Sequence, residues 1–403
     1  MSFADLGLNP ELQRAVAESG YTQPTPIQMQ AIPVILAGLD VMGGAQTGTG
    51  KTAGFTLPLL QRLAPHASTS TSPARHPVRA LILAPTRELA VQVHESVKTY
   101  SKYVPLRSAC IYGGVDMRAQ VAELRTGIEI VVATPGRLLD HVQQKTIQLG
   151  QVEVLVLDEA DRMLDMGFIP DIKRILELLP SARQSLLFSA TFSDEIKRLA
   201  DQMLKNPQLI EVARRNMVSE TITHRVHPVS SGLKRNLLAQ LLRNQPDTQA
   251  LIFVDTKLLC GRLAHFLVRH EIAADAIHGD KGQAQRSDTL EAFKSGRLRV
   301  LVATDVAARG LDIDDLPMVI NYELPHTAED YVHRIGRTGR AGRTGYAVSL
   351  VSSEEKSRLA EIEKLIKLQI PQEIVPGFAP EPDYFEAGTH KKRSHRPESF
   401  DTP

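Results

Sequence analysis

The stretch Ala45-Gln-Thr-Gly-Thr-Gly-Lys-Thr52 decides how the rest of this chain is interpreted. Its glycines allow successive backbone N–H groups to point into one cavity, while Lys51 can reach the β- and γ-phosphates of a nucleotide and the Thr52 hydroxyl can ligate Mg²⁺. The strict phosphate-loop pattern begins with glycine, whereas this chain has Ala45. The alternative is an ordinary turn rich in glycine and threonine. The residues expected to contact the nucleotide are Ala45, Gln46, Thr47, Gly48, Thr49, Gly50, Lys51 and Thr52.

The segments on either side of this loop favour the phosphate site. Residues 39–45 can form a short strand, and residues 52–60 can form a helix. A helix that begins near Lys51 would direct its positive end toward bound phosphates. We therefore expect a nucleoside triphosphate and Mg²⁺ to bind at this loop.

Length and composition limit the remaining possibilities. At 403 residues with 42% hydrophobic content, the chain can form two domains with cores of their own, at roughly 150 to 200 residues each. The net charge of +1 means that any nucleic-acid surface must be a local patch. Cys110 and Cys260 have no cysteine or histidine partners at ligand spacing, so we expect neither a disulfide framework nor a zinc site. No apolar run approaches ~18 residues, so we expect a cytoplasmic protein without membrane contact.

Apolar runs of strand length alternate with helical patterns in both halves of the chain. The runs in the first half are residues 79–84, 108–112, 128–133, 152–157 and 185–188. Those in the second half are residues 250–254, 273–278, 299–303, 317–321 and 346–351. This alternation predicts an α/β fold with a mostly parallel sheet flanked by helices in each half. Ligands of such sheets bind beyond the carboxyl ends of the strands, where this chain carries small and polar residues.

Composition also suggests where the domains end. We expect a first domain over residues 1–212, a linker over 213–222, a second domain over 223–370 and a flexible tail over 371–403. Residues 65–77, rich in serine, threonine and proline, are expected to form a surface loop.

A second chemical centre is Val154-Leu-Val-Leu-Asp-Glu-Ala-Asp161, in which apolar residues lead to carboxylates at a strand end. Asp158 can hold Mg²⁺, directly or through water, and Glu159 can orient and deprotonate a water for attack on the γ-phosphate. Taken alone, a strand followed by acids is also typical of a solvated turn. Together with the phosphate loop, it indicates ATP hydrolysis.

These two motifs, the loop at 45–52 and Asp158-Glu-Ala-Asp161, closely resemble those of DEAD-box ATP-dependent RNA helicases. The resemblance covers nearly the whole chain. It implies two tandem RecA-like domains, with ATP and RNA sites at the cleft, ATP and Mg²⁺ as cofactors, and RNA bound largely without sequence preference. The sequences of residues 3–8, 43–45 and 165–170 are similar to those of the bacterial RhlE-type subgroup.

The N-terminal segment is similar to the family's adenine-recognition motif, through Phe3 and Gly20-Tyr-Thr-Gln-Pro-Thr-Pro-Ile-Gln28. The resemblance implies that Gln28 reads the adenine edge and that Tyr21 and Phe3 belong to the nucleotide site. An amide can donate to N7 and accept from the N6 amino group, which would favour ATP over GTP. The alternative is a proline-rich helix start with an exposed glutamine.

Other strand-end clusters are similar to the family's RNA-contacting motifs. In the first domain these are Pro85, Thr86, Arg87, Gly113, Gly114, Thr134, Pro135, Gly136 and Arg137. Glycines, helix starts and arginines suit a phosphate backbone and position a strand without reading its sequence. Each cluster also occurs as an ordinary turn, and Arg87 could instead pair with an acid such as Glu88. The resemblance further implies that Ser189 and Thr191 couple the metal-binding acids to the partner domain.

In the second domain, the resemblance implies an RNA path and a second half of the ATP site. The expected RNA contacts are Gly279, Gln283, Arg286, Thr304 and Arg309, and Asp312 is expected to meet the ribose. The run His333-Arg-Ile-Gly-Arg-Thr-Gly-Arg340 is the most specific feature, since Arg337 and Arg340 can present two guanidinium groups to the γ-phosphate as arginine fingers. His333 is assigned to the same catalytic set. The alternative is a basic helix end that binds only solvent.

The expected function is RNA-stimulated ATP hydrolysis that unwinds short RNA duplexes or remodels RNA–protein complexes, in ribosome assembly or RNA decay with ribosomal or decay proteins as partners. One alternative is an ATP-gated RNA clamp or assembly scaffold with little turnover. A DNA helicase would differ around residues 158–161 and 333–340. The basic patch at residues 390–396 either adds weak RNA affinity or merely solvates the chain end.

Overall fold

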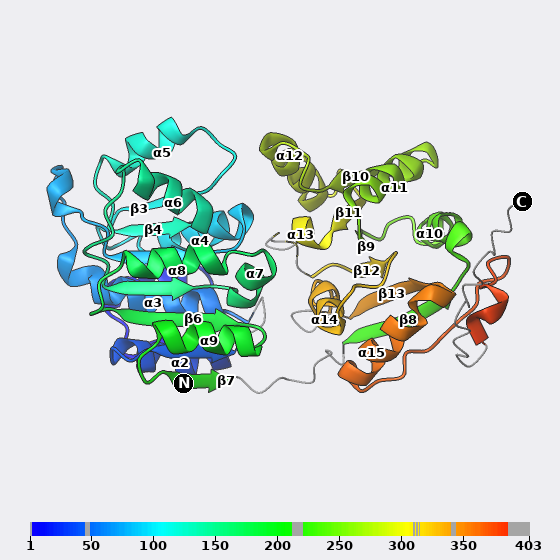
Figure 1. The fold of residues 1–403 in the computed structure, drawn as a ribbon, viewed down its shortest axis with the longest axis horizontal. Helices are drawn as coiled ribbons and strands as arrows, with labels where there is room; N and C mark the ends of the chain where they lie inside the picture. The colour runs from blue at the N-terminus through cyan, green and yellow to red at the C-terminus, as the bar shows by residue number, and fades with distance from the viewer. Residues whose placement is uncertain are drawn as a thin grey trace, which may run out of the picture. The chain divides into compact units, whose positions relative to one another are not determined.

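Two parallel β-sheets, each flanked by helices, organise the chain (Figure 1). The computed structural model describes residues 2–44, 49–211, 221–308, 311, 313, 315–339 and 344–385. The chain divides into two units, the first containing strands β1–β7 and the second strands β8–β13. The predicted pair of parallel α/β domains is therefore confirmed.

The first sheet has seven parallel strands in the order β3-β4-β2-β5-β6-β1-β7. Its strands are β1 (Val41–Gly44), β2 (Ala80–Leu83), β3 (Ser108–Ile111), β4 (Ile130–Ala133), β5 (Val154–Leu157), β6 (Gln184–Ser189) and β7 (Gln208–Glu211). The central strands β2, β4 and β5 are buried along their whole length, which is why they read as continuous apolar runs. The order makes β1, which leads into the phosphate loop, a neighbour of β6.

Helices cover both faces of this sheet and enclose two cores. They are α1 (Pro10–Glu18), α2 (Pro26–Leu36), α3 (Lys51–Leu63), α4 (Arg87–Tyr100), α5 (Met117–Leu124), α6 (Pro135–Gln143), α7 (Ala160–Asp165), α8 (Ile169–Glu177) and α9 (Asp194–Met203). Successive residues of β5 alternate between the cores: Val156 joins the one that contains Phe55 of α3, and Leu155 joins the one that contains Ile172 of α8. The strand ends are thereby held between two packed layers.

The second sheet has six parallel strands in the order β10-β11-β9-β12-β13-β8. Its strands are β8 (Ile222–Pro228), β9 (Ala250–Val254), β10 (Ala274–Ile277), β11 (Val300–Thr304), β12 (Met318–Asn321) and β13 (Gly345–Val351). Its helices are α10 (Lys234–Arg243), α11 (Lys257–Arg269), α12 (Gln283–Lys294), α13 (Asp305–Ala308), α14 (Ala328–Ile335) and α15 (Lys356–Ile366). None of the helices in the described ranges is long and apolar enough to cross a membrane.

Two strands were not predicted, and both lie at sheet edges. Strand β7 is mostly exposed, with only Ile210 buried, so it lacks the apolar run that marks a central strand. Strand β8 begins at Ile222, within the segment expected to be a linker. Most of that segment lies outside the described residues, and the predicted domain boundaries stay a prediction.

The structure differs from the flexible tail expected from residue 371, because residues 371–385 pack on the second unit. Val226 of β8 donates its N–H to the carbonyl of Pro371 at 3.0 Å and accepts from the N–H of Glu373 at 2.9 Å. Tyr384 is only 3% exposed and joins the core that contains Val226. The composition of this segment is polar, but Tyr384 is buried, Val375 and Phe378 are half-buried against the core, and the backbone extends the sheet edge.

The surface loop at residues 65–77 has one buried anchor. It contains two short 3-10 turns, η2 (Ala64–His66) and η3 (Pro73–Arg75). His76 follows them, is 2% exposed, and places its Nδ1 atom 2.5 Å from Glu129 of the neighbouring core. The C-terminal end of the loop is thus fixed to the sheet through His76.

Candidate functional site

The strand order gathers the catalytic candidates at one edge of the first sheet. Strands β5, β6 and β1 are consecutive neighbours, and Gly44 at the end of β1 is in register with Ser189 at the end of β6. Asp158 and Glu159 follow β5 directly. The acids, the coupling serine and the start of the phosphate loop therefore share one edge, as expected for parallel strands. Loop residues Ala45, Gln46, Thr47 and Gly48 lie outside the described residues.

Lys51 forms a buried ion-pair triad with both acids. Its Nζ lies 2.9 Å from Asp158 Oδ1 and 3.5 Å from Glu159 Oε1, and all three side chains are almost fully buried. Burial lowers the pKa of Lys51, but Asp158 and Glu159 outweigh it and raise that pKa, so the ammonium is charged at neutral pH. Burial raises the pKa of Asp158, although Lys51 opposes the shift.

Glu159 is held in an unusual backbone conformation. Its φ of 57° and ψ of 55° lie in the left-handed region, which few residues other than glycine adopt. Arg162, one turn later on α7, places Nη1 2.7 Å from Glu159 Oε2. The carboxylate is therefore held between Lys51 and Arg162. Strained backbone of this kind is concentrated at functional sites, where the surrounding structure sustains it.

The donor set around Asp158 suits Mg²⁺. Apart from the ion pair with Lys51, its two buried carboxylate oxygens accept no hydrogen bond from the described residues. Carboxylate oxygens without hydrogen-bond donors are suitable ligands for a hard cation, and Mg²⁺ commonly takes only one or two protein carboxylates besides waters and substrate phosphates. Accordingly, the described residues contain no group of three or more histidine, cysteine, aspartate or glutamate ligands. Thr52, half-buried in the first turn of α3, is the second candidate ligand.

Gln28 joins the adenine-recognition segment to the phosphate loop. Its side-chain Oε1 accepts from the N–H of Thr25 at 2.8 Å, and its Nε2 donates to the carbonyl of Gly50 at 2.9 Å. Gly50 has a φ of +85°, and a Cβ atom there would lie 2.6 Å from Gln28 Nε2. The contact thus requires glycine at position 50 both for its conformation and for space.

The two aromatic candidates of this segment lie in different environments. Phe3 is 7% exposed and packs in the hydrophobic core, which leaves little of its ring free to contact a base. Tyr21 is 49% exposed, with its ring centroid 6.5 Å from that of Tyr100. Of the two, Tyr21 has the surface that stacking on a nucleotide would need.

Asp161 ties the acids to the segment after β6. Its Oδ2 accepts from the backbone N–H groups of Ala190 and Thr191, each at 3.1 Å, and from the Thr191 hydroxyl at 3.3 Å. In return, the backbone N–H of Asp161 donates to Ser189 Oγ at 3.2 Å. Ser189 and Thr191 therefore bind the last acid of the motif through a two-way hydrogen-bond network. A movement of the segment that follows β6 would therefore displace Asp161, and a movement of Asp161 would displace that segment.

The RNA-binding candidates of the first unit follow β2, β3 and β4, which are neighbours in the sheet. Thr86 caps α4 by accepting from the N–H of Leu89 at 3.2 Å. A Cβ atom on Gly114 would lie 2.3 Å from the Arg87 guanidinium, so this arginine lies directly against the glycine loop. Pro85, Thr134 and Pro135 are buried at these strand ends.

Arg137 is bound within the protein rather than extended toward solvent. Its Nη1 donates to the carbonyl of Val115 at 3.3 Å and to Gln120 Oε1 at 3.1 Å, and its side chain is only 11% exposed. The sequence predicted a phosphate contact for Arg137. In the structure it holds the segment that follows Gly113 and Gly114 in place.

The candidates from the second half of the chain also occupy strand and helix ends. Gly279 is exposed after β10, Thr304 ends β11, and Gln283 and Arg286 lie in the first turn of α12. His333 lies in the last turn of α14 and is half-buried, and Arg337 follows the helix and is buried. The candidates Arg309, Asp312 and Arg340 lie outside the described residues.

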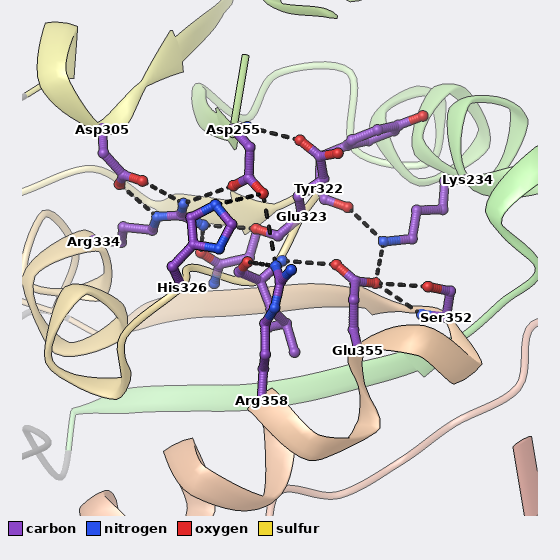
Figure 2. Close-up of polar contacts among 12 residues, drawn as sticks. Lys234, Asp255, Asp305, Tyr322, Glu323, His326, Arg334, Ser352, Glu355 and Arg358 are labelled. Atoms are coloured by element: carbon purple, nitrogen blue, oxygen red, sulfur yellow. Dashed lines mark hydrogen bonds and ion pairs between the residues drawn. The ribbon is translucent and has the colours of Figure 1, made fainter. Parts of the chain in front are cut away.

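The structure brings out polar residues that the sequence reasoning did not assign. Arg162 binds the catalytic candidate Glu159, and its spacing of three residues on a helix was a usable signal. Arg334 and Asp305 form an ion pair in the second unit, where Arg334 is 1% exposed and Asp305 is half-buried (Figure 2). Both stand inside motifs that the sequence singled out, but a pairing across 29 residues leaves no local pattern.

Comparisons with known proteins agree with this geometry. The family model for DEAD/DEAH box helicases matches residues 25–199, and the model for the helicase conserved C-terminal domain matches residues 233–342. The DEAD-box ATP-dependent RNA helicase RhpA of Helicobacter pylori is 42% identical over 369 residues, covering 92% of this chain and 73% of RhpA. The ATP-dependent RNA helicase DeaD of Escherichia coli is 44% identical over 376 residues, covering 93% of this chain and 58% of DeaD.

A solved structure extends the comparison to the fold. Dbp5 of S. cerevisiae bound to RNA and ADP BeF3 is 32% identical, with a TM-score of 0.81, and the match covers 93% of this chain and 95% of that one. The similarity spans both sheets. The chain belongs to the DEAD-box family of ATP-dependent RNA helicases.

Proposed function

We propose that this chain hydrolyses ATP in response to RNA and uses the cycle to open short RNA duplexes or to remodel RNA–protein complexes. The buried triad of Lys51, Asp158 and Glu159 is the observation that carries the proposal. A lysine held by two acids beyond a parallel strand has little structural purpose, because such buried charges cost solvation energy. They suit a site where phosphate charge is bound and a water is activated.

The triad defines the roles of its members. The Lys51 ammonium binds phosphate oxygens of ATP, which compete with Asp158 and Glu159 for it. Glu159, held by Arg162, orients a water and accepts its proton as the water oxygen attacks the γ-phosphorus and ADP leaves. Mg²⁺, held by Thr52 and Asp158, would supply neutralisation of phosphate charge. Arg337 and Arg340 complete the site by stabilising the γ-phosphate during transfer.

The RNA-binding role rests on glycines for which the described residues give no steric reason. A Cβ atom added to Gly113 or to Gly136 would meet no atom within 4 Å in the part of the chain that the structure describes. The absence of a steric reason inside the chain favours a close approach by another molecule, and a phosphate backbone is such a partner at strand ends and helix starts. Contacts of this kind are independent of sequence, so RNA of any sequence is the expected ligand.

Several finer assignments belong to the same proposal. We place the chain in the RhlE-type subgroup because the sequences of residues 3–8, 43–45 and 165–170 resemble those of its members. We propose that the first domain covers residues 1–212 and the second residues 223–370. We also propose action in the cytoplasm, on ribosome assembly or RNA decay with protein partners from those processes. The chain spans 58% of the length of DeaD, so activities of that relative beyond the shared segment are not transferred to it.

ATP hydrolysis measured with and without single-stranded RNA tests the proposal. Matched DNA controls for the choice of nucleic acid, and Glu159→Gln controls for the catalytic acid because it keeps the shape of the side chain and removes the base. RNA alone should stimulate turnover, and the variant should abolish it while still binding ATP. Turnover near zero, with ATP still tightening RNA binding, would replace the helicase by an ATP-gated RNA clamp.

A further inference from the structure

Arg334 on α14 is an arginine whose donors are engaged inside the second unit. Its Nε and Nη2 donate to the two carboxylate oxygens of Asp305 at 2.7 and 2.6 Å. Its Nη1 donates to Asn321 Oδ1 at 3.1 Å and to the carbonyl of Glu323 at 2.6 Å. With a side chain that is 1% exposed and donors already committed, Arg334 is not available to bind a phosphate itself.

The pair joins two elements that carry different parts of the proposed chemistry. Asp305 is the first residue of α13 and directly follows Thr304, a candidate RNA contact at the end of β11. Arg334 lies on α14, next to His333 and three residues before Arg337, the candidates for action on the γ-phosphate. A forked guanidinium on a carboxylate is among the strongest and most directional hydrogen-bonded links between two side chains.

We propose that Arg334 and Asp305 are a positioning pair that couples RNA binding to ATP hydrolysis. This inference rests on the proposed function. Because the bidentate contact fixes α13 against α14, a shift of α13 on RNA binding also shifts the helix that presents His333 and Arg337. The pair thus acts through other residues and does not touch either ligand.

The backbone turn that precedes α14 is held by further hydrogen bonds, so the helix that carries Arg334 begins from a rigid turn (Figure 2). Lys234 donates to the carbonyl of Tyr322 at 2.9 Å, Glu355 accepts from the N–H of Leu324 at 3.0 Å, and Arg358 donates to the carbonyl of Leu324 at 3.0 Å. The turn between β12 and α14 is therefore held from both sides. Arg334 extends this held region to α13.

The test compares three variants of the full chain. Arg334→Lys keeps the charge and removes the fork, so it separates geometry from electrostatics. Asp305→Asn keeps the volume and one acceptor oxygen, and it supplies the test should Arg334→Lys fail to fold. Arg299→Lys is the matched control, because it makes the same change at another arginine of the second unit. Arg299 directly precedes β11, its Nη2 donates to the carbonyl of Leu242 at 2.5 Å, and its side chain bonds neither α13 nor α14 in the described part of the chain.

Two quantities are measured for each variant: RNA-stimulated ATP turnover, and the factor by which a non-hydrolysable ATP analogue tightens binding of single-stranded RNA. Arg334→Lys and Asp305→Asn should each reduce that coupling factor by about tenfold, toward no coupling, and leave analogue binding without RNA unchanged. The double variant should do little more than either single one, since both break the same link. Arg299→Lys should lower the melting temperature and keep the coupling.

The outcomes separate this inference from the proposed function. Lack of RNA stimulation in the unmodified chain would overturn the proposed function and the inference with it. Normal stimulation in the unmodified chain, with Arg334→Lys and Asp305→Asn losing only thermal stability as Arg299→Lys does, would overturn the inference alone. Additive losses of coupling in the double variant would likewise show that the two residues do not act as a pair.

Discussion

At the residue scale, Glu159 shows how the fold concentrates strain and charge at one position. A left-handed backbone at a non-glycine residue costs on the order of 1–3 kcal/mol, and such strain persists where neighbouring contacts over-determine it. Here those contacts are the ion pairs with Lys51 and Arg162. The direction of the carboxylate is consequently set before any ligand binds, which is the condition for an effective general base.

Arg162 is therefore expected to control turnover rather than substrate affinity. Replacing it in Arg162→Met removes the contact to Glu159 Oε2 at 2.7 Å and should lower kcat by roughly 10- to 100-fold with little change in KM, because orientation of a base contributes to the transition state. Steady-state kinetics with saturating RNA measure both constants. Arg174→Met, at an exposed arginine paired with Asp171, is the control, and an equal loss there would contradict the specific role of Arg162.

Gln28 is expected to act on nucleotide binding through Gly50. In Gln28→Glu, a carboxylate oxygen replaces the amide that donates to the Gly50 carbonyl at 2.9 Å, so an attraction becomes a repulsion. The loss of about 1.5–3 kcal/mol corresponds to roughly 10- to 100-fold weaker ATP binding. Titration with a fluorescent ATP analogue measures it, with the exposed Gln23→Glu as control. Unchanged affinity would mean that the link to the phosphate loop is not needed.

The sequence predicted which residues carry the chemistry better than how they are held. Lys51, Asp158 and Glu159 stand in motifs whose spacing reveals their role, and the structure brings them together. The internal bonds of Arg137 could not be foreseen, because its partner Val115 lies 22 residues away on another loop. Partners of this kind depend on how the elements pack, which a linear pattern does not contain.

At the element scale, burial decided which strands could be recognised. Strand β9 was predicted with its exact bounds because all its residues are buried and apolar. Strands β7 and β8 were not predicted. Both lie at sheet edges and expose polar side chains, so neither forms a continuous apolar run in the sequence. A helix start of this chain also has a local signal that the sequence analysis did not use: Thr256 accepts from the N–H of Leu259 at 3.2 Å to begin α11.

Strand β8 also carries a group that makes the second unit sensitive to acid. His224 is 5% exposed, contacts the Tyr331 hydroxyl of α14 at 2.8 Å through Nδ1, and has its pKa lowered by burial to about 4. Between about pH 6.5 and pH 4 the unfolded chain binds this proton and the folded chain does not, so stability falls as the pH falls through that window.

The expected loss attributable to His224 between pH 7 and pH 5 is about 2 kcal/mol, at ~1.4 kcal/mol per pH unit below the unfolded pKa. Urea unfolding at both pH values measures it, and His224→Gln should lose that much less on acidification. His265→Gln, at an exposed position on α11, should behave as the unmodified chain does. Identical pH dependence in the chain with His224→Gln would refute the assignment.

The C-terminal segment is expected to stabilise the second unit through Tyr384. Its ring is 3% exposed in a core with Val226 and Ile370, so Tyr384→Ala should lower the free energy of unfolding by about 3 kcal/mol. Leu368→Ala, at a side chain that is 42% exposed, should cost much less. Denaturant unfolding compares the two, and equal small losses would return residues 371–385 to the status of a loose tail.

At the scale of the whole molecule, the repeated pattern of apolar runs was sufficient to predict two parallel sheets. The phosphate loop, the acids and Gln28 belong to the first unit, and His333 and Arg337 follow strands of the second. Each unit has its own cores, so each has the means to fold alone. The proposed chemistry is nevertheless divided, since neither unit holds all the groups that phosphoryl transfer needs.

This division predicts the effect of cutting the chain between the units. A protease site inserted within residues 213–220 permits comparison of the same protein before and after cleavage. The first unit should still bind ATP through Lys51 and Gln28, but RNA-stimulated turnover should fall by ~10³-fold because Arg337 and Arg340 are supplied only by the other unit. Uncleaved protein carrying the same insertion is the control for the inserted residues.

The loss should result from breaking the covalent connection between the two units. A short linker provides an effective concentration in the millimolar range, so separate units mixed at about 1 μM should associate too rarely to act together. Raising the concentration of the second unit should restore turnover in proportion until the units saturate. Gel filtration shows whether the cleaved units have separated. Full RNA stimulation by separated units would mean that the first unit holds a complete catalytic site. The arginines of the second unit would then have another role.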